Sequence, residues 1–144
     1  MAKAKSVIIA RKVYFCCAHQ YLSDKLSDAK NHAVFGACVN VHGHDYTLEA
    51  YFSGTVDPHS GLVVNLMDID QILRAVVQPL DHRFLNKDVD YFKTHIPTTE
   101  NIARYCFEQI KTQCQLMPIE LERVRLIEGQ DLWTDYGPNQ ELSL

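Results

Sequence analysis

The sequence predicts an α+β fold in which helices cover one face of an antiparallel sheet. The main observation is the order of elements: two strand-like segments, then two helical segments, then two more strand-like segments. Strand segments show alternating apolar residues, and helical segments show apolar residues three and four apart. No repeat, linker or low-complexity stretch interrupts this order, so residues 1–144 are expected to form a single domain with a substantial core.

The first two strands follow from β-branched and aromatic residues in alternation. Residues 6–21 ("SVIIARKVYFCCAHQY") form the first predicted strand, one face of which carries Val13, Phe15, Cys17 and His19. A polar stretch follows, with a short helix expected near residues 27–35. Residues 44–54 form the second strand, one face of which carries His44, Tyr46, Leu48, Ala50 and Phe52.

Two helices follow. The first has an apolar face at helical spacing made of Leu66, Ile69, Ile72, Leu73, Val76 and Val77. Asp68 and Gln71 suit its capped start, and Pro79 stops it. The second covers residues 96–114 with Thr98 or Thr99 as N-cap, and its core face carries Ile102, Cys106, Ile110 and Cys114.

Strands over residues 120–129 and 132–137 complete a four-stranded sheet. The edges of such a sheet can be open, and an open edge invites pairing with another subunit.

Composition excludes several classes of protein. A net charge of -4 means that the chain lacks the excess of basic residues that is typical of nucleic-acid-binding proteins. The apolar run of residues 7–10 is too short for a membrane span or a signal sequence. The five cysteines are odd in number and contain no CxxC pair, which favours a reduced, cytoplasmic protein.

Three histidines form a candidate metal site. His42 and His44 point to the same side of a strand, and Gly43 allows close backbone approach. His19 lies on the first strand, which could pair with the second. Three imidazoles and one open position are typical of catalytic zinc. Solvent-facing strand histidines are the alternative, and Cys38 as a fourth ligand would instead make a closed, structural site.

Two acidic positions are weaker candidates. Asp81 and His82 come just after the end of the first predicted long helix. They form either a polar turn or a pair in which the carboxylate orients the imidazole for proton transfer. Glu128 ends an apolar strand and is either solvated or a buried acceptor for a guanidine-like edge.

Taken together, these pieces resemble the 6-pyruvoyl-tetrahydropterin synthase / 6-carboxytetrahydropterin synthase family. The matching stretches are "FCCAH", "FGAC…HGHDY", "SGLVVNLMDID", "PLDHRFLN", "PTTENIA" and "LIEG". Each is weak alone, but they occur in the family's order from Phe15 to Glu128. The resemblance implies the tunnelling fold (T-fold), in which subunits join their sheets into a barrel as a trimer or hexamer with active sites between subunits.

The resemblance also assigns roles to individual residues. It implies that His19, His42 and His44 bind Zn²⁺ and that Cys38 is the catalytic base. It implies that Asp81 and His82 are a paired acid/base from a neighbouring subunit. Glu128 would hold the pterin's N–H edge, with help from Thr99 and Glu100.

The implied enzyme is a zinc-dependent lyase acting on a pterin triphosphate, 7,8-dihydroneopterin triphosphate. The three residues between Cys38 and His42 resemble the 6-carboxy branch of queuosine biosynthesis, which also releases acetaldehyde, and this spacing favours a 6-carboxytetrahydropterin product. Residues 26–38 and 88–103 look more like the 6-pyruvoyl branch, which is the alternative. A non-catalytic zinc- or pterin-binding module is a further alternative.

Two points in the motifs stay open. Cys17 stands where the family commonly has Ala, and it is either a small core residue or an additional soft ligand. The cations that hold the triphosphate are not identified by the motifs; the candidates are Lys25, Lys30 and Arg83.

Overall fold

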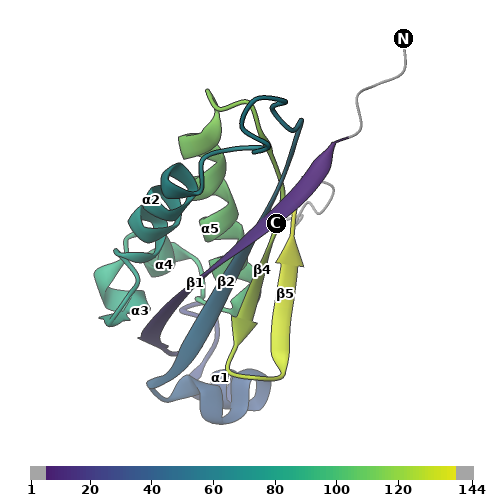
Figure 1. Ribbon diagram of the computed structural model, residues 1–144. Helices are drawn as coiled ribbons and strands as arrows, with labels where there is room; N and C mark the ends of the chain where they lie inside the picture. Colours follow the sequence, from purple (N-terminus) through teal and green to yellow (C-terminus); the bar gives the residue numbers. More distant parts are fainter. Residues whose placement is uncertain (1–5, 139–144) are drawn as a thin grey trace.

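The computed structural model describes residues 6–138, which form one mostly antiparallel sheet with helices on one face (Figure 1). The strand order is β3-β1-β2-β4-β5. The strands are β1 (Val7–His19), β2 (His42–Gly54), β3 (Arg83–Phe84), β4 (Glu120–Glu128) and β5 (Leu132–Tyr136). The α+β class and the four predicted strands are confirmed. β3 was not predicted: it is two residues long and pairs in parallel with β1.

The helices include the three expected ones and three more that are only about one turn long. They are α1 (Asp28–Phe35), the 3-10 helix η1 (Gly36–Val39), α2 (Leu66–Val77), α3 (Leu85–Asp88), α4 (Tyr91–Thr94) and α5 (Thr99–Cys114). The sequence analysis missed η1, α3 and α4 because four residues are too few to show helical periodicity.

The N-terminal caps of α2 and α5 can be compared with the sequence prediction. The side chain of Asn65 caps α2 by accepting from the Met67 N–H, so the predicted cap at Asp68 and Gln71 is wrong. Leu66, predicted on the core face, is 45% exposed because it lies at the first helical position. Thr98 caps α5 through the Asn101 N–H, which settles the choice between Thr98 and Thr99.

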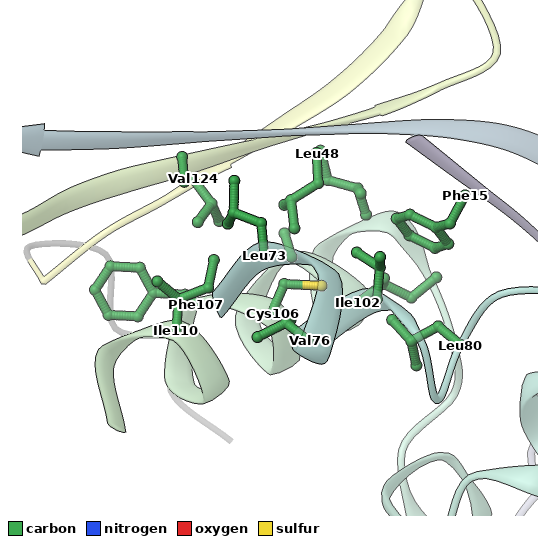
Figure 2. Close-up of a cluster of buried hydrophobic side chains, with 14 of the residues drawn as sticks. Phe15, Leu48, Leu73, Val76, Leu80, Ile102, Cys106, Phe107, Ile110 and Val124 are labelled. Carbon is green, nitrogen blue, oxygen red and sulfur yellow. The ribbon is translucent and has the colours of Figure 1, made fainter. Parts of the chain in front are cut away.

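The core lies between the sheet and the pair α2–α5. Figure 2 shows Leu48 and Val124 from the sheet opposite Leu73 and Val76 of α2 and Ile102 and Phe107 of α5. The predicted α5 face is buried throughout: Ile102, Cys106, Ile110 and Cys114. Burying apolar surface at roughly 25 cal/mol per Å² makes this layer the main stabilising contact of the fold.

The pairing of β1 with β2 decides where the candidate ligands lie. The sequence analysis expected only that these two strands could pair; in the antiparallel register His19 faces His42 and Cys17 faces His44. Gly43 allows this approach, because a Cβ there would lie 3.0 Å from the Cys17 carbonyl oxygen. Residues alternate across a strand, so Cys16 lies on the helix-free face while Cys17 and His19 lie on the helix side.

Both long edges of the sheet are open among the described residues. β1 pairs with β3 only at Cys17 and Ala18, and β5 has a partner only in β4. Large apolar side chains are exposed on both edge strands: Val7, Ile8, Tyr14, Leu132 and Trp133. Within residues 6–138, no helix has the length and apolar character needed to cross a membrane.

Candidate active site

Three imidazoles converge where β1 ends and β2 begins. His19, His42 and His44 each present a ring nitrogen, and these atoms lie within 4.8 Å of one another. The Nε2 atoms of His19 and His42 are 3.0 Å apart. His19 is fully buried, whereas His42 and His44 are half-buried. The Cys38 thiol is outside this cluster, so the described residues do not make a closed four-ligand site.

The hydrogen bonds of the rings show that this cluster fits a cation. His19 Nδ1 lies 2.9 Å from the Pro97 carbonyl oxygen, and His42 Nδ1 lies 2.7 Å from that of Asn40. A carbonyl oxygen only accepts, so each Nδ1 carries the proton and each Nε2 presents a lone pair. Two lone pairs facing each other at 3.0 Å repel unless a cation lies between them.

His44 supplies the third donor atom. Its Nε2 is buried and has no hydrogen-bond partner within residues 6–138. The nearest acidic atom, Glu128 Oε1, is 3.2 Å away but is not aligned for a hydrogen bond. A buried unpaired nitrogen is costly in an apo protein, whereas a metal ion would satisfy it.

Burial keeps His19 in the form that a metal requires. Desolvation lowers the pKa of His19 from 6.5 to about 4, although the Glu128 carboxylate raises it slightly. His19 is therefore neutral at pH 7, with a free lone pair on Nε2.

Glu128 lies beside the histidines at the end of β4. Its Oε2 accepts hydrogen bonds from Thr99 Oγ1 at 2.8 Å and from the Tyr46 hydroxyl at 3.1 Å. Only 11% of the Glu128 side chain is exposed. Since a carboxylate has about four acceptor positions, two remain for a ligand edge with two adjacent N–H groups. The buried-acceptor interpretation of Glu128 therefore fits the geometry.

The start of α5 builds part of this pocket. Pro97 holds His19 through its carbonyl, and buried Thr99 holds Glu128. Glu100, the next residue, is exposed in the first turn of α5 and makes no described side-chain hydrogen bond.

Two residues of the pocket were missed by sequence reasoning. The Tyr46 hydroxyl lies between Glu128 and His19, 3.3 Å from His19 Nδ1. Tyr21 packs edge-on against His19, with 5.0 Å between ring centroids. Tyr46 had been placed only on the core face, and an apolar-face position does not reveal which polar atom a tyrosine hydroxyl reaches.

Cys38 lies next to the imidazoles rather than among them. It is half-buried in η1, and its carbonyl oxygen accepts a 2.8 Å hydrogen bond from the Tyr21 N–H. Tyr21 in turn contacts His42, with ring centroids 6.2 Å apart. These contacts place Cys38 beside Tyr21, at the rim of the cluster.

Asp81 and His82 lie elsewhere, beside Cys16 at the edge of β1. Asp81 Oδ1 is 3.0 Å from His82 Nδ1 and accepts the Cys16 N–H at 3.0 Å. Adjacent side chains seldom face each other; His82 faces Asp81 with a φ of 58°, in the left-handed region. The Cys16 N–H bond is the main cause that lowers the pKa of Asp81. Within one chain this pair belongs to a cluster separate from the three histidines.

Cys17 behaves as a core residue. It is 5% exposed, and burial raises the pKa of its thiol to about 12. It does not belong to the ligand cluster among the described residues. The small-hydrophobe interpretation of Cys17 fits these observations.

Comparison with known proteins gives a consistent result. The family model described as 6-pyruvoyl tetrahydropterin synthase matches residues 8–139. The solved structure of Caenorhabditis elegans 6-pyruvoyl tetrahydropterin synthase is similar with a TM-score of 0.87 and 37% identity, covering 95% of this chain and 99% of that one.

Two curated sequences represent the two branches. Human 6-pyruvoyl tetrahydrobiopterin synthase is 36% identical over 124 residues, which is 83% of each chain. An Archaeoglobus fulgidus protein provisionally named 6-carboxy-5,6,7,8-tetrahydropterin synthase is 33% identical over 98 residues, covering 68% of this chain and 76% of the relative.

Proposed function

The chain belongs to the 6-pyruvoyl tetrahydropterin synthase family, and from this premise we propose that it is a metal-dependent lyase of pterin chemistry. Its proposed substrate is 7,8-dihydroneopterin triphosphate, and its proposed product is 6-pyruvoyl-tetrahydropterin, formed with elimination of triphosphate. The observation that carries this proposal is the cluster of three imidazole nitrogens beside a carboxylate with free acceptor positions.

The choice of product reverses the preference drawn from the Cys38–His42 spacing. The 6-pyruvoyl relatives match more of the chain, with 83% coverage for the human protein against 68% for the archaeal 6-carboxy relative. The 6-carboxy product with release of acetaldehyde is the second candidate, favoured by that spacing alone.

His19, His42 and His44 would hold the metal, which we propose to be zinc. When bound, a zinc ion would polarise the hydroxyl oxygens of the substrate side chain and acidify the adjacent C–H and O–H bonds. The chain's part is to keep three imidazole rings aimed at one point, which the carbonyls of Pro97 and Asn40 do for two of them.

Glu128 would anchor the pterin. A pterin presents a 2-amino group and a ring N–H side by side, and the two acceptor positions left on Glu128 suit that edge. Thr99 and Tyr46 orient the carboxylate, so the bound ring is positioned with the substrate side chain toward the imidazoles. Glu100 is proposed to assist only through its place at the start of α5.

Proton transfer is proposed for Cys38 and His82. Cys38 as thiolate would remove a proton from the substrate side chain, and His82, oriented by Asp81, would return one. Because Asp81 and His82 are outside the histidine cluster of their own chain, we propose that a neighbouring subunit supplies them in a trimer or hexamer. The open edges of β1 and β5 are available for that assembly.

Product identification tests this proposal. Zinc-loaded protein incubated with 7,8-dihydroneopterin triphosphate should yield triphosphate and 6-pyruvoyl-tetrahydropterin by mass spectrometry, without acetaldehyde. Acetaldehyde in equal amount to triphosphate would establish the second candidate. Bound metal and pterin without turnover would instead establish a non-catalytic binding module.

The variant Cys38→Ala shows, in the same assay, whether Cys38 is a catalytic base or a metal ligand. The proposed role requires turnover to fall by roughly 100-fold or more while zinc content stays at the wild-type level. Loss of zinc together with turnover would show that Cys38 binds the metal, as in a closed structural site.

A further inference from the structure

We propose that Cys16, Asp81 and His82 form a second metal site, which takes thiophilic divalent cations such as Zn²⁺. One ligand atom from each, namely a thiol sulfur, a carboxylate oxygen and an imidazole nitrogen, lies within 4.8 Å of the other two. These are the three ligand types that zinc accepts, and water can complete a tetrahedral site. The site is distinct from the three histidines because Cys16 lies on the helix-free face of the sheet.

The backbone holds these ligands together before any ion binds. The Cys16 N–H donates to Asp81 Oδ1 at 3.0 Å, and the His82 N–H donates to the Cys16 carbonyl oxygen at 2.6 Å. The left-handed φ of 58° at His82 brings its Nδ1 to 3.0 Å from Asp81 Oδ1. A strained residue held by two such hydrogen bonds indicates a preorganised site rather than a chance cluster.

Access and charge both suit a divalent ion. The cluster borders a shallow depression lined in part by Ala18, Asp45, Arg83 and Phe84, and 79% of the His82 side chain is exposed. On binding, the Cys16 thiol releases its proton to solvent, so thiolate, carboxylate and neutral imidazole balance the two positive charges. Asp45, directly opposite Cys16 on β2, adds a carboxylate that offsets Arg83.

Occupation of this site has a consequence for turnover. A metal there engages Asp81 and His82, so they no longer exchange protons, and excess zinc inhibits the enzyme. This consequence rests on the proposed function, whereas the binding itself does not.

Cadmium absorption tests the binding directly. The experiment uses full-length, reduced Cys38→Ser protein, so that the thiol beside the histidines does not contribute; Cys17, Cys106 and Cys114 are buried. Titration with Cd²⁺ should produce a thiolate-to-cadmium absorption band whose final amplitude corresponds to one cadmium–thiolate bond per chain, while the three histidines take up a second ion without adding to the band. Adding Cys16→Ser should abolish the band, because Cys16 supplies the only thiolate of the proposed site. Absence of the band in Cys38→Ser, or its survival without Cys16, would overturn the proposal.

The number of bound zinc ions is a second, independent test of the site. Equilibrium dialysis should find two zinc ions per wild-type chain and one per Cys16→Ser chain, with two retained in the matched control Cys114→Ser. His82→Gln should also lose the second ion, which guards against a folding defect peculiar to Cys16→Ser. One ion in the wild type would refute the site. Inhibition of turnover by excess zinc that persists in Cys16→Ser would refute the consequence while leaving the binding result intact.

Discussion

At the scale of single residues, the site depends on which nitrogen of each imidazole carries the proton. Pro97 and Asn40 hold the Nδ1 protons of His19 and His42, so both Nε2 lone pairs point into the cluster. The paired strands bring the rings together, and backbone carbonyls from outside the strands set their tautomers. Two predictions belong to this scale.

The first prediction concerns pH and the metal-free protein. Burial lowers the pKa of His19 to about 4, so between pH 6.5 and 4 the unfolded chain binds a proton that the folded chain does not. This contribution to the free energy of unfolding is therefore complete above pH 6.5 and falls as the pH drops toward 4, by up to about 3 kcal/mol.

Urea unfolding of chelator-treated protein at pH 7 and 4.5 measures this contribution. His19→Asn, which keeps a donor for Pro97, should lose less stability between the two pH values than wild type. His59→Gln, at an exposed turn, is the matched control and should behave as wild type. An equal loss in wild type and His19→Asn would contradict the assignment.

The second prediction is that Tyr46→Phe weakens pterin binding without removing the metal. The variant keeps the ring stacked on Phe15 but leaves Glu128 Oε2 with Thr99 as its described donor. A hydrogen bond to a charged group contributes about 1.5–3 kcal/mol, so KM should rise by roughly tenfold or more, with kcat and zinc content little changed.

Tyr51→Phe is the control for that experiment. Tyr51 also donates its hydroxyl to a carboxylate, that of Glu49, but on the helix-free face. Its KM should stay at the wild-type value. An unchanged KM in Tyr46→Phe would show that the hydroxyl is not part of pterin binding.

At the scale of elements, α5 connects stability to the site. Thr99 in its first turn and Pro97 just before its N-cap supply contacts to the site, and Thr98 caps the helix by accepting the Asn101 N–H. The capping of α2 by Asn65 is equivalent, but α2 carries none of the site residues.

These two caps make a matched pair of variants. Thr98→Ala and Asn65→Ala should each lower the free energy of unfolding by about 1 kcal/mol. Thr98→Ala should also raise KM several-fold, since Pro97 and Thr99 lose their fixed position, whereas Asn65→Ala should leave KM unchanged. Equal KM values in both variants would show that the start of α5 does not affect substrate binding.

At the scale of the whole molecule, the chain has a sheet with open edges and two separate groups of proposed active-site residues. The histidines and Glu128 lie on the helix side of the sheet, and Asp81 and His82 lie at the edge of β1. The exposed apolar residues of β1 and β5 lie on the strands that would pair with other copies.

The prediction at this scale is that Ile8→Lys disrupts assembly and turnover together. Ile8 is 60% exposed on the open edge strand β1, and a charge there opposes edge pairing. Light scattering should show the wild type as a trimer or hexamer and the variant as smaller species with at least about tenfold lower turnover. Leu116→Lys, fully exposed just after α5, is the control. A monomeric wild type with full activity would refute the inter-subunit site.

The sequence by itself determined the elements whose pattern is long. The four main strands, α2 and α5, the α5 core face and the shared side of His42 and His44 follow from periods of two and 3.6 residues. Those rules act over five to sixteen residues in these elements, so a single exception does not hide the pattern. The resemblance of the motifs to a known family likewise depended only on their order along the chain.

The tertiary structure alone decided the contacts between residues distant in sequence or set by one unusual dihedral angle. Tyr46 meets Glu128 across 82 positions, and Pro97 meets His19 across 78. The left-handed backbone of His82 turns its ring onto Asp81, and the one-turn helix η1 brings Cys38 to the rim of the histidine cluster. No period in the sequence encodes such contacts, because they arise only when the packed layers fix where each polar atom points.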